Sequence, residues 1–236
     1  MKINRLLAVT IACLVYTTGI SQLRPLTPNP ALIPTTEIFD INGKPWNINN
    51  PEARVNGTPW MCTSWNMGYV KLTDGKRADS VLLNFDMEYN RVVFTINSIV
   101  YEFSSMVQEA VFDYTENGIT KTAVFRTGYP EKNGHKTTTL YQVLSEGPKY
   151  ELVQYADKKT MERRSFNTPT TINYELSATL YIYDPAAKTL EKIKTKKSSV
   201  IAALPGKEEA IEKICRENNL DLKSIDQLAL LVSRLQ

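Results

Sequence analysis

The chain has 236 residues, enough for one large domain or two small ones. Its composition, with 42% hydrophobic residues, 22% charged residues and 12 tyrosines, excludes a disordered chain and predicts a sizeable core. The formal net charge is +3, and without residues 1–21, which carry Lys2 and Arg5 and no acid, 26 bases face 25 acids, or +1. This balance excludes a general attraction to nucleic acid, and no nucleic-acid partner is expected.

The first 21 residues have the pattern of a secretory signal peptide. Lys2 and Arg5 precede an apolar run from Leu6 to Ile20, and small residues at Gly19-Ile20-Ser21 offer a cleavage point. A buried helix or a retained anchor is the alternative for a run of this length. We therefore expect an exported protein, in the periplasm, at the outer membrane or outside the cell, with no transmembrane anchor after cleavage and no cofactor.

Three cysteines bear on the predicted compartment of the protein. Cys13 leaves open a lipoprotein acylation site, although Thr10 stands where a leucine is expected and the apolar run continues past the cysteine. Cys62 and Cys215 remain after cleavage in a compartment that permits disulfides. We favour two buried, unpaired thiols, with a disulfide as the alternative, because proximity cannot be read from sequence.

A linker and an aromatic segment follow. Residues 22–36 contain four prolines and no periodicity, which predicts an extended Pro-rich linker. Trp46, Trp60 and Trp65 then fall within 20 residues of one another. Flat aromatic rings can stack on sugars, so the three tryptophans are candidates for a carbohydrate-binding surface. We favour the alternative that they plug one end of a sheet core.

Residues 37–197 are predicted to form an antiparallel β domain. Apolar residues alternate from Val81 to Tyr89 and again from Val92 to Ile96, as in half-buried strands. Hairpin turns are expected at four places, because Asn and Gly accept positive φ; these are Asp74-Gly75, Glu88 to Asn90, Asn97-Ser98 and Asn117-Gly118. Residues 47–59 read as loop and the charged stretch 157–171 as a solvated excursion. The remainder predicts eight to ten strands.

The last 39 residues change from strand to helix patterns. Residues 198–236 contain three short amphipathic segments, and Ser224-x-x-Gln227 is a capping box at the start of the last one. Helices this small are not stable alone, so they should dock on the sheet. The predicted fold is α+β, mostly β: a strongly curved antiparallel meander or barrel-like sheet with a small C-terminal helical subdomain.

The order of these features is similar to a family of uncharacterised exported bacterial proteins. The likeness rests on Gly57 to Trp60, Trp65 with Gly68 to Gly75, Phe125 to Pro130, Tyr141 to Leu144, and the lysine-rich entry to the helical tail. It covers nearly all of the chain after the signal peptide. The resemblance implies export, the β domain and the tail, and it implies no catalytic residue.

Two further features are candidates for function. A lysine cluster lies where the last strand meets the tail, formed by Lys192, Lys194, Lys196 and Lys197. Together with the N-terminus of the following helix it could bind an anion. We favour the alternative that these lysines prevent edge-to-edge pairing of an exposed strand. His135 is the single histidine and stands in a polar loop, where we expect it to be solvated. No metal site is predicted, because the ligand types are not clustered.

The function that agrees best with these patterns is an exported, non-enzymatic envelope protein. It would bind an envelope protein or a surface glycan, with the tryptophans and the four lysines as its candidate binding surface. A lipid or apolar-ligand carrier is the first alternative and requires a sheet closed around an unfilled apolar cavity. A hydrolase of envelope polymers is the second and requires three or more polar side chains converging in a pocket.

Overall fold

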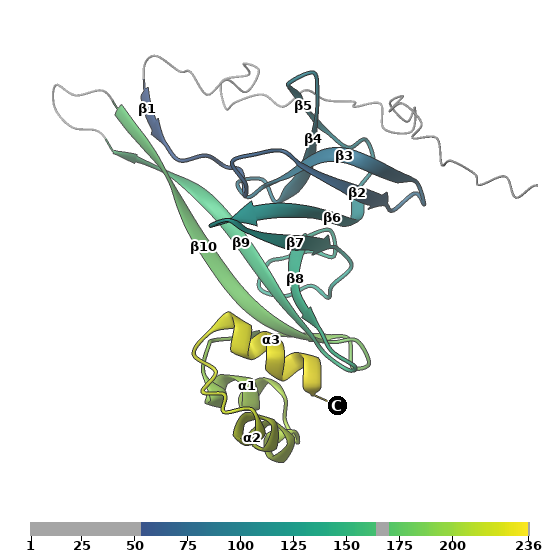
Figure 1. Cartoon of the computed structure of the whole chain (residues 1–236), viewed down its shortest axis with the longest axis vertical. Coiled ribbons are helices and arrows are strands. Elements are labelled where there is room, and N and C mark those ends of the chain that lie inside the picture. Colours follow the sequence, from purple (N-terminus) through teal and green to yellow (C-terminus); the bar gives the residue numbers. More distant parts are fainter. Residues whose placement is uncertain (1–52, 164–169, 236) are drawn as a thin grey trace, which may run out of the picture.

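The computed structural model describes residues 53–163 and 170–235, so the predicted signal peptide, the linker, Cys13 and Trp46 lie outside the described residues. Eleven strands form one curved, open sheet, and three helices follow it (Figure 1). The α+β, mostly β class with a curved sheet and C-terminal helices is therefore confirmed. The elements are β1 (Ala53–Asn56), β2 (Asn66–Leu72), β3 (Arg77–Asp86), β4 (Arg91–Ile96), β5 (Ile99–Glu102), β6 (Val107–Glu116), β7 (Ile119–Arg126), β8 (Tyr141–Glu146), β9 (Glu151–Arg163), β10 (Thr170–Asp184), β11 (Thr189–Ile193), α1 (Lys197–Ala203), α2 (Glu208–Glu217) and α3 (Ile225–Arg234).

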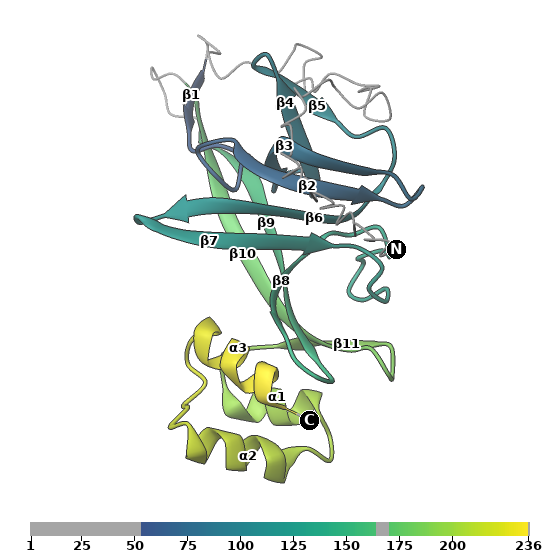
Figure 2. The same ribbon diagram turned by 45° about the vertical axis from the view of Figure 1, so that its right-hand side comes forward.

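The strands follow the order β1-β10-β9-β8-β7-β6-β2-β3-β4-β5, with β11 also paired to β10. All pairings are antiparallel except β1 with β10, which is parallel. The views in Figures 1 and 2 show β9 and β10 as a long ribbon that connects the upper part of the sheet to the helices below.

Two segments differ from the sequence prediction. Residues 53–56, read as loop, form β1 against the start of β10. The charged stretch from Asp157, expected as an excursion, continues β9 as far as Arg163, and β10 is already a strand at Thr170. Both predictions were wrong because backbone pairing supplies hydrogen bonds whatever the side chains are: β1 pairs with the start of β10, and the mostly exposed end of β9 pairs with the first half of β10.

The expected hairpin turns are confirmed. Asn97 and Ser98 have φ values of 51° and 66° between β4 and β5, and Asn117 and Gly118 have values of 52° and 77° between β6 and β7. Positive φ at both central residues matches the right-handed twist of the flanking strands. The turn residues therefore fix the register of these hairpins locally.

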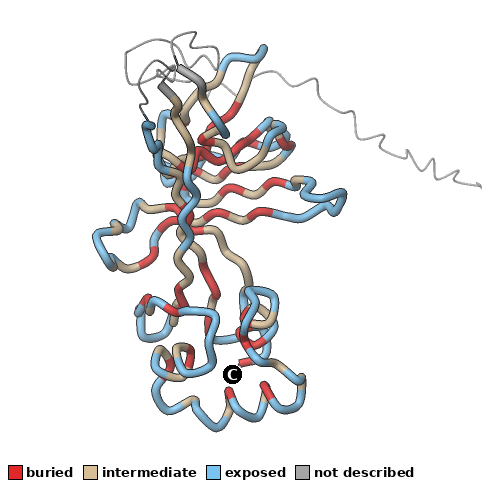
Figure 3. Tube along the Cα trace, turned by 90° about the vertical axis from the view of Figure 1, so that its left-hand side faces the viewer, coloured by how far each residue is buried: buried red, intermediate tan, exposed pale blue. Residues whose placement is uncertain are grey.

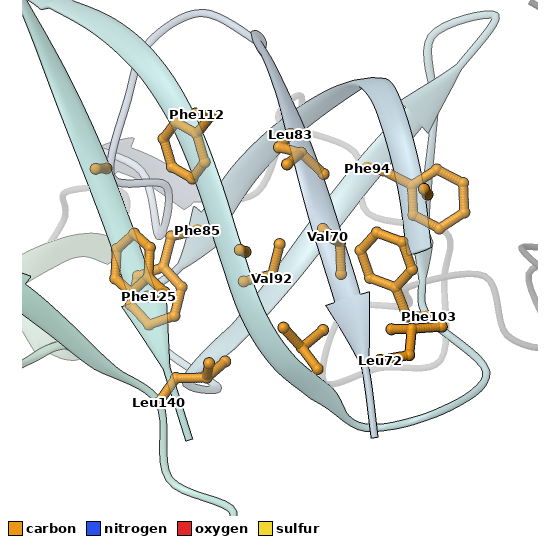
Figure 4. Close-up of a cluster of buried hydrophobic side chains, with 14 of the residues drawn as sticks. Val70, Leu72, Leu83, Phe85, Val92, Phe94, Phe103, Phe112, Phe125 and Leu140 are labelled. Atoms are coloured by element: carbon orange, nitrogen blue, oxygen red, sulfur yellow. The ribbon is translucent and has the colours of Figure 1, made fainter. Parts of the chain in front are cut away.

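The concave side of the upper sheet is filled by apolar side chains (Figure 4). Phe125 stacks on Phe85 with ring centroids 4.1 Å apart and on Phe112 at 5.9 Å. The alternation predicted along β3 and β4 points inward as expected, except that Tyr89 lies beyond the end of β3 and is 49% exposed. The condition for a carrier is not met, because the sheet is open and side chains fill its concave side.

The helices cover one face of the lower sheet. α3 packs against β8 and β9, α1 against β11, and α2 against α3 (Figure 2). The backbone of α3 comes so close to the β8–β9 turn that a Cβ on Gly147 would lie 2.1 Å from the carbonyl oxygen of Val232. The Ser224 hydroxyl accepts a hydrogen bond from the amide of Gln227, as the capping box predicts, and α3 thereby starts at the expected residue.

Candidate functional site

The segment before β2 presents two tryptophans on the outer face of the sheet. Residues 59–61 run beside the end of β3, where the amide of Met61 donates to the Phe85 carbonyl at 2.8 Å and the amide of Met87 donates to the Pro59 carbonyl at 2.9 Å. Residues 62–65 then leave the sheet as a loop before β2 begins at Asn66. Trp60 and Trp65 stand on either side of this loop in the sequence, and the loop brings their rings close together.

Asn84 holds the loop in position. Its side chain is buried, accepts a hydrogen bond from the Cys62 amide at 3.2 Å, and donates to the carbonyls of Cys62 at 2.8 Å and Ser64 at 3.3 Å. Buried polar groups need such partners, and here the loop backbone supplies them. A buried asparagine on β3 is therefore the support on which the loop is built.

Lys158 anchors the segment from the other side. Its ammonium group donates to the carbonyls of Thr58 at 3.0 Å and Trp60 at 2.6 Å, and its amide donates to the carbonyl of Met87 at 3.2 Å. Burial lowers the pKa of Lys158, and the nearby thiol of Cys62 opposes that shift. The two carbonyls replace part of the water that the partly buried ammonium group loses.

Trp60 and Trp65 end 5.9 Å apart between ring centroids, with an angle of 50° between their planes. Both are partly exposed, and neither belongs to the apolar clusters of the described residues. The favoured interpretation as a core plug was wrong for these two residues. The inward positions of this segment are taken by its neighbours, such as Met61, which packs on the core, while the loop on Asn84 turns Trp65 outward.

Two exposed apolar residues continue this surface. Met67 and Leu82 are directly opposite each other on β2 and β3 and are 52% and 39% exposed. Met67 is the second residue of β2 and follows Trp65 by two positions, where the loop enters the strand. We call Trp60, Trp65, Met67 and Leu82 the outer apolar surface.

The lysine cluster lies elsewhere, where β11 meets α1 (Figure 2). Lys192, Lys194, Lys196 and Lys197 are all exposed, and within the described residues none of them forms an ion pair. The Ser199 hydroxyl accepts a hydrogen bond from the Lys194 amide, and the Ser199 amide donates to the Lys196 carbonyl. These groups are therefore engaged within the chain, which weakens the anion-seat alternative. The structure does not bring the lysines and tryptophans together.

His135 is not the solvated loop residue that was expected. Its ring packs on that of Tyr155 with centroids 4.0 Å apart and 35° between the planes, and its Nδ1 atom is 2.6 Å from the hydroxyl of Tyr141. The ring of Tyr181 lies 6.0 Å away. The loop before β8 folds back onto a sheet face rich in tyrosine, and this contact displaces water from the imidazole.

Burial lowers the pKa of His135, the charge of Lys192 lowers it further, and Asp157 opposes both. Burial likewise raises the pKa of Tyr141. Sequence reasoning missed this cluster because its tyrosines come from separate strands. Their spacing of two, as in Tyr181 and Tyr183, was a sign that one strand face is aromatic.

A cleft of about 390 Å³ opens at one end of the concave core. Its floor includes Phe103 and Leu140, and its rim includes Arg91 and Glu102. The Arg91 guanidinium donates to Glu102 at 3.0 Å and to the buried carboxylate of Asp86 at 2.9 Å. The charged groups of the rim are thus paired within the protein, Arg91 with Glu102 and Asp86.

Cys62 and Cys215 are unpaired. Cys62 packs against the upper core and Cys215 lies in the helical cluster, so the prediction of unpaired thiols is confirmed; Cys215 is buried as predicted, whereas Cys62 is only partly buried. Burial raises the pKa of Cys62 to about 11, although a hydrogen bond with Asn66 opposes the shift. A thiol with so high a pKa is almost entirely protonated at neutral pH and is a weak nucleophile.

Over residues 53–163 and 170–235, no group of three or more His, Cys, Asp or Glu side chains is arranged to hold a metal ion. None of the helices in these ranges has both the length and the apolar character needed to cross a membrane. No family model, curated protein or solved structure matches this chain.

Proposed function

We propose that the protein is an exported, non-enzymatic envelope protein that binds another protein through its outer apolar surface. The observation that carries this proposal is the pair of partly exposed tryptophans, on a loop held by the buried Asn84, near the exposed side chains of Met67 and Leu82. Tryptophan and methionine are enriched at the centres of protein interfaces, and contiguous exposed apolar residues mark interaction sites. The signal-peptide pattern at Lys2 and Arg5 supports export.

A glycan partner is less well supported. The planes of the two indole rings differ by 50°, so they do not form one flat platform for a sugar. Met67 and Leu82 add apolar area and no hydrogen-bond donors for sugar hydroxyls. The same surface suits apolar side chains of a protein, which pack on tilted rings.

Photo-crosslinking in cells tests the proposal. A photoreactive amino acid is placed at Met67, or at Met106 as a matched control, because Met106 is also an exposed methionine (44%) and lies beside Thr73, beyond the other end of β2. One dominant protein adduct at Met67, absent at Met106 and reduced at least tenfold by Trp65→Ala, is expected. Equal labelling at both positions would refute the proposal. Trp65-dependent sedimentation with purified cell-wall polymer would instead indicate that the partner is a glycan.

A further inference from the structure

One edge of β10 is paired only at its two ends. β9 pairs with β10 from Thr171 to Tyr183 along one edge. On the opposite edge, β1 pairs with residues 170–173 and β11 with residues 180–184. Among the described strands none pairs with this edge of residues 174–179, which we call the slot. At about 3.3 Å per residue, the slot offers roughly 20 Å of strand edge.

The slot lacks the features that protect exposed strand edges. Residues 175–178 are exposed, including Leu176 at 60%. In Figure 3, which views the molecule from the side where Figure 1 labels β10, the middle of the long ribbon is coloured as exposed. The sequence from Tyr174 to Thr179 has no proline and no lysine, and Glu175 is its single charge. Proteins commonly block free edges with such residues. An unprotected edge can accept another strand through backbone hydrogen bonds.

The flanking strands exclude a second copy as the occupant. β1 and β11 both extend outward from the edge of β10, so the slot is recessed between them. If two copies placed their β10 edges together, the β1 and β11 strands of each copy would occupy the space of the β10 strand of the other. A single extended segment has no flanking strands and fits without this collision.

The charge at one end of the slot indicates the chemistry of that segment. In the β10–β11 register, Ile193 is opposite Leu180, so Lys194 follows at the end of the slot next to Thr179. Lys196 is also exposed and lies close to Lys194, because its amide donates to the Lys194 carbonyl at 2.7 Å. A strand that leaves the slot here would pass Lys194 and come near Lys196.

We propose that the slot binds an extended segment of about six residues from a partner protein, with acidic residues at the end that lies beside Lys194. Backbone hydrogen bonds to β10 hold the segment, and the lysine cluster selects its acidic end. This site is separate from the outer apolar surface, so the test of either one can fail while the other succeeds.

The test uses a displayed library of six random residues flanked on both sides by two glutamates, and a matched library flanked by lysines. Only the glutamate library should yield binders to the full chain. The best peptide should lose at least tenfold in affinity for the Lys194→Glu/Lys196→Glu variant and less than twofold for Lys136→Glu/Lys149→Glu, which changes two exposed lysines elsewhere. Equal enrichment from both libraries would overturn the proposal.

Two measurements establish the mode of binding. Methylation of single peptide nitrogens should weaken binding at every second residue, because alternate amides of a strand face the same edge. Alternate amides of residues 174–179 point away from β9, and these should exchange fast in the free protein and slowly after peptide is added, while the amides bonded to β9 stay slow in both. Uniform tolerance of methylation, or protection of the outward-pointing amides without peptide, would overturn strand addition at the slot.

Discussion

Replacement of Asn84 by alanine should destabilise the protein and disorganise the tryptophan pair. The side chain accepts hydrogen bonds from the amides of Cys62 and Phe85 and donates to the carbonyls of Cys62 and Ser64. Each bond contributes about 1 kcal/mol net, and a buried group left without a partner costs about 1–3 kcal/mol. The expected loss is about 2–4 kcal/mol, a large part of the roughly 5–15 kcal/mol of a typical domain.

Urea denaturation followed by circular dichroism measures this loss, and NMR of the indole N–H groups reports the tryptophans. The matched control is Asn173→Ala, which removes an amide hydrogen bond to Asn56 at the surface and should cost less than about 0.5 kcal/mol. Asn84→Ala should shift the indole signals of Trp60 and Trp65. A loss below about 1 kcal/mol with unchanged indole signals would refute the role of Asn84.

Three further outcomes follow from burial. Phe125→Ala removes a buried ring stacked on two others and should cost about 3–5 kcal/mol in urea denaturation, whereas Ile119→Ala, at a 62% exposed position, should cost under about 0.5 kcal/mol; similar losses would contradict the core assignment. The pKa of His135 lies below its usual 6.5, so the unfolded chain binds the proton more readily, and Tm should fall as pH drops from 7 through 6.5 towards the lower folded pKa. His135→Asn should flatten the profile in that window, and an unchanged profile would contradict this prediction. At pH 8, iodoacetamide should leave Cys62 and Cys215 unmodified in the folded protein and alkylate both in concentrated guanidinium chloride; a disulfide-linked peptide found after digestion without reductant would contradict the structure.

The features that the sequence predicts well are those decided by neighbouring residues. Asn117-Gly118 forms its turn because both residues accept positive φ, and Ser224 caps α3 because its hydroxyl accepts a hydrogen bond from the backbone amide three residues later. The alternation of Leu83, Phe85, Val92 and Phe94 follows from the apolar core on the concave side, although the intervening residues Asn84, Asp86 and Val93 are buried as well. Such choices depend on backbone sterics and local hydrogen bonds, and no knowledge of the rest of the fold is needed.

The features that it misses depend on contacts between distant segments. The setting of His135 depends on Tyr155 and Tyr181, which approach it only when the loop before β8 folds onto the sheet. The outward position of Trp65 depends on Asn84, which reads in the sequence as an ordinary polar residue of a strand. Strand order decides both cases, and the pairing of β2 with β6 leaves no local mark in the sequence.

Lys158 links the outer apolar surface to the slot. Its side chain holds the carbonyls of Thr58 and Trp60, and its backbone lies opposite Leu176, in the middle of the slot. The long β9–β10 ribbon is therefore tied at its centre to the segment that carries Trp60.

Lys158→Met tests this connection without any partner. Loss of the ammonium group frees the carbonyls that fix residues 58–60, so hydrogen exchange should accelerate at the amides of Met61 and Met87, which join this segment to β3. Lys159→Met changes the neighbouring side chain, which is 81% exposed, and should leave both amides unchanged. Equal protection in Lys158→Met and the parent chain would mean that strand pairing alone holds the segment. The links that remain would then be the Lys158 amide, which donates to the Met87 carbonyl, and the hydroxyl of Tyr174, which donates to Glu88.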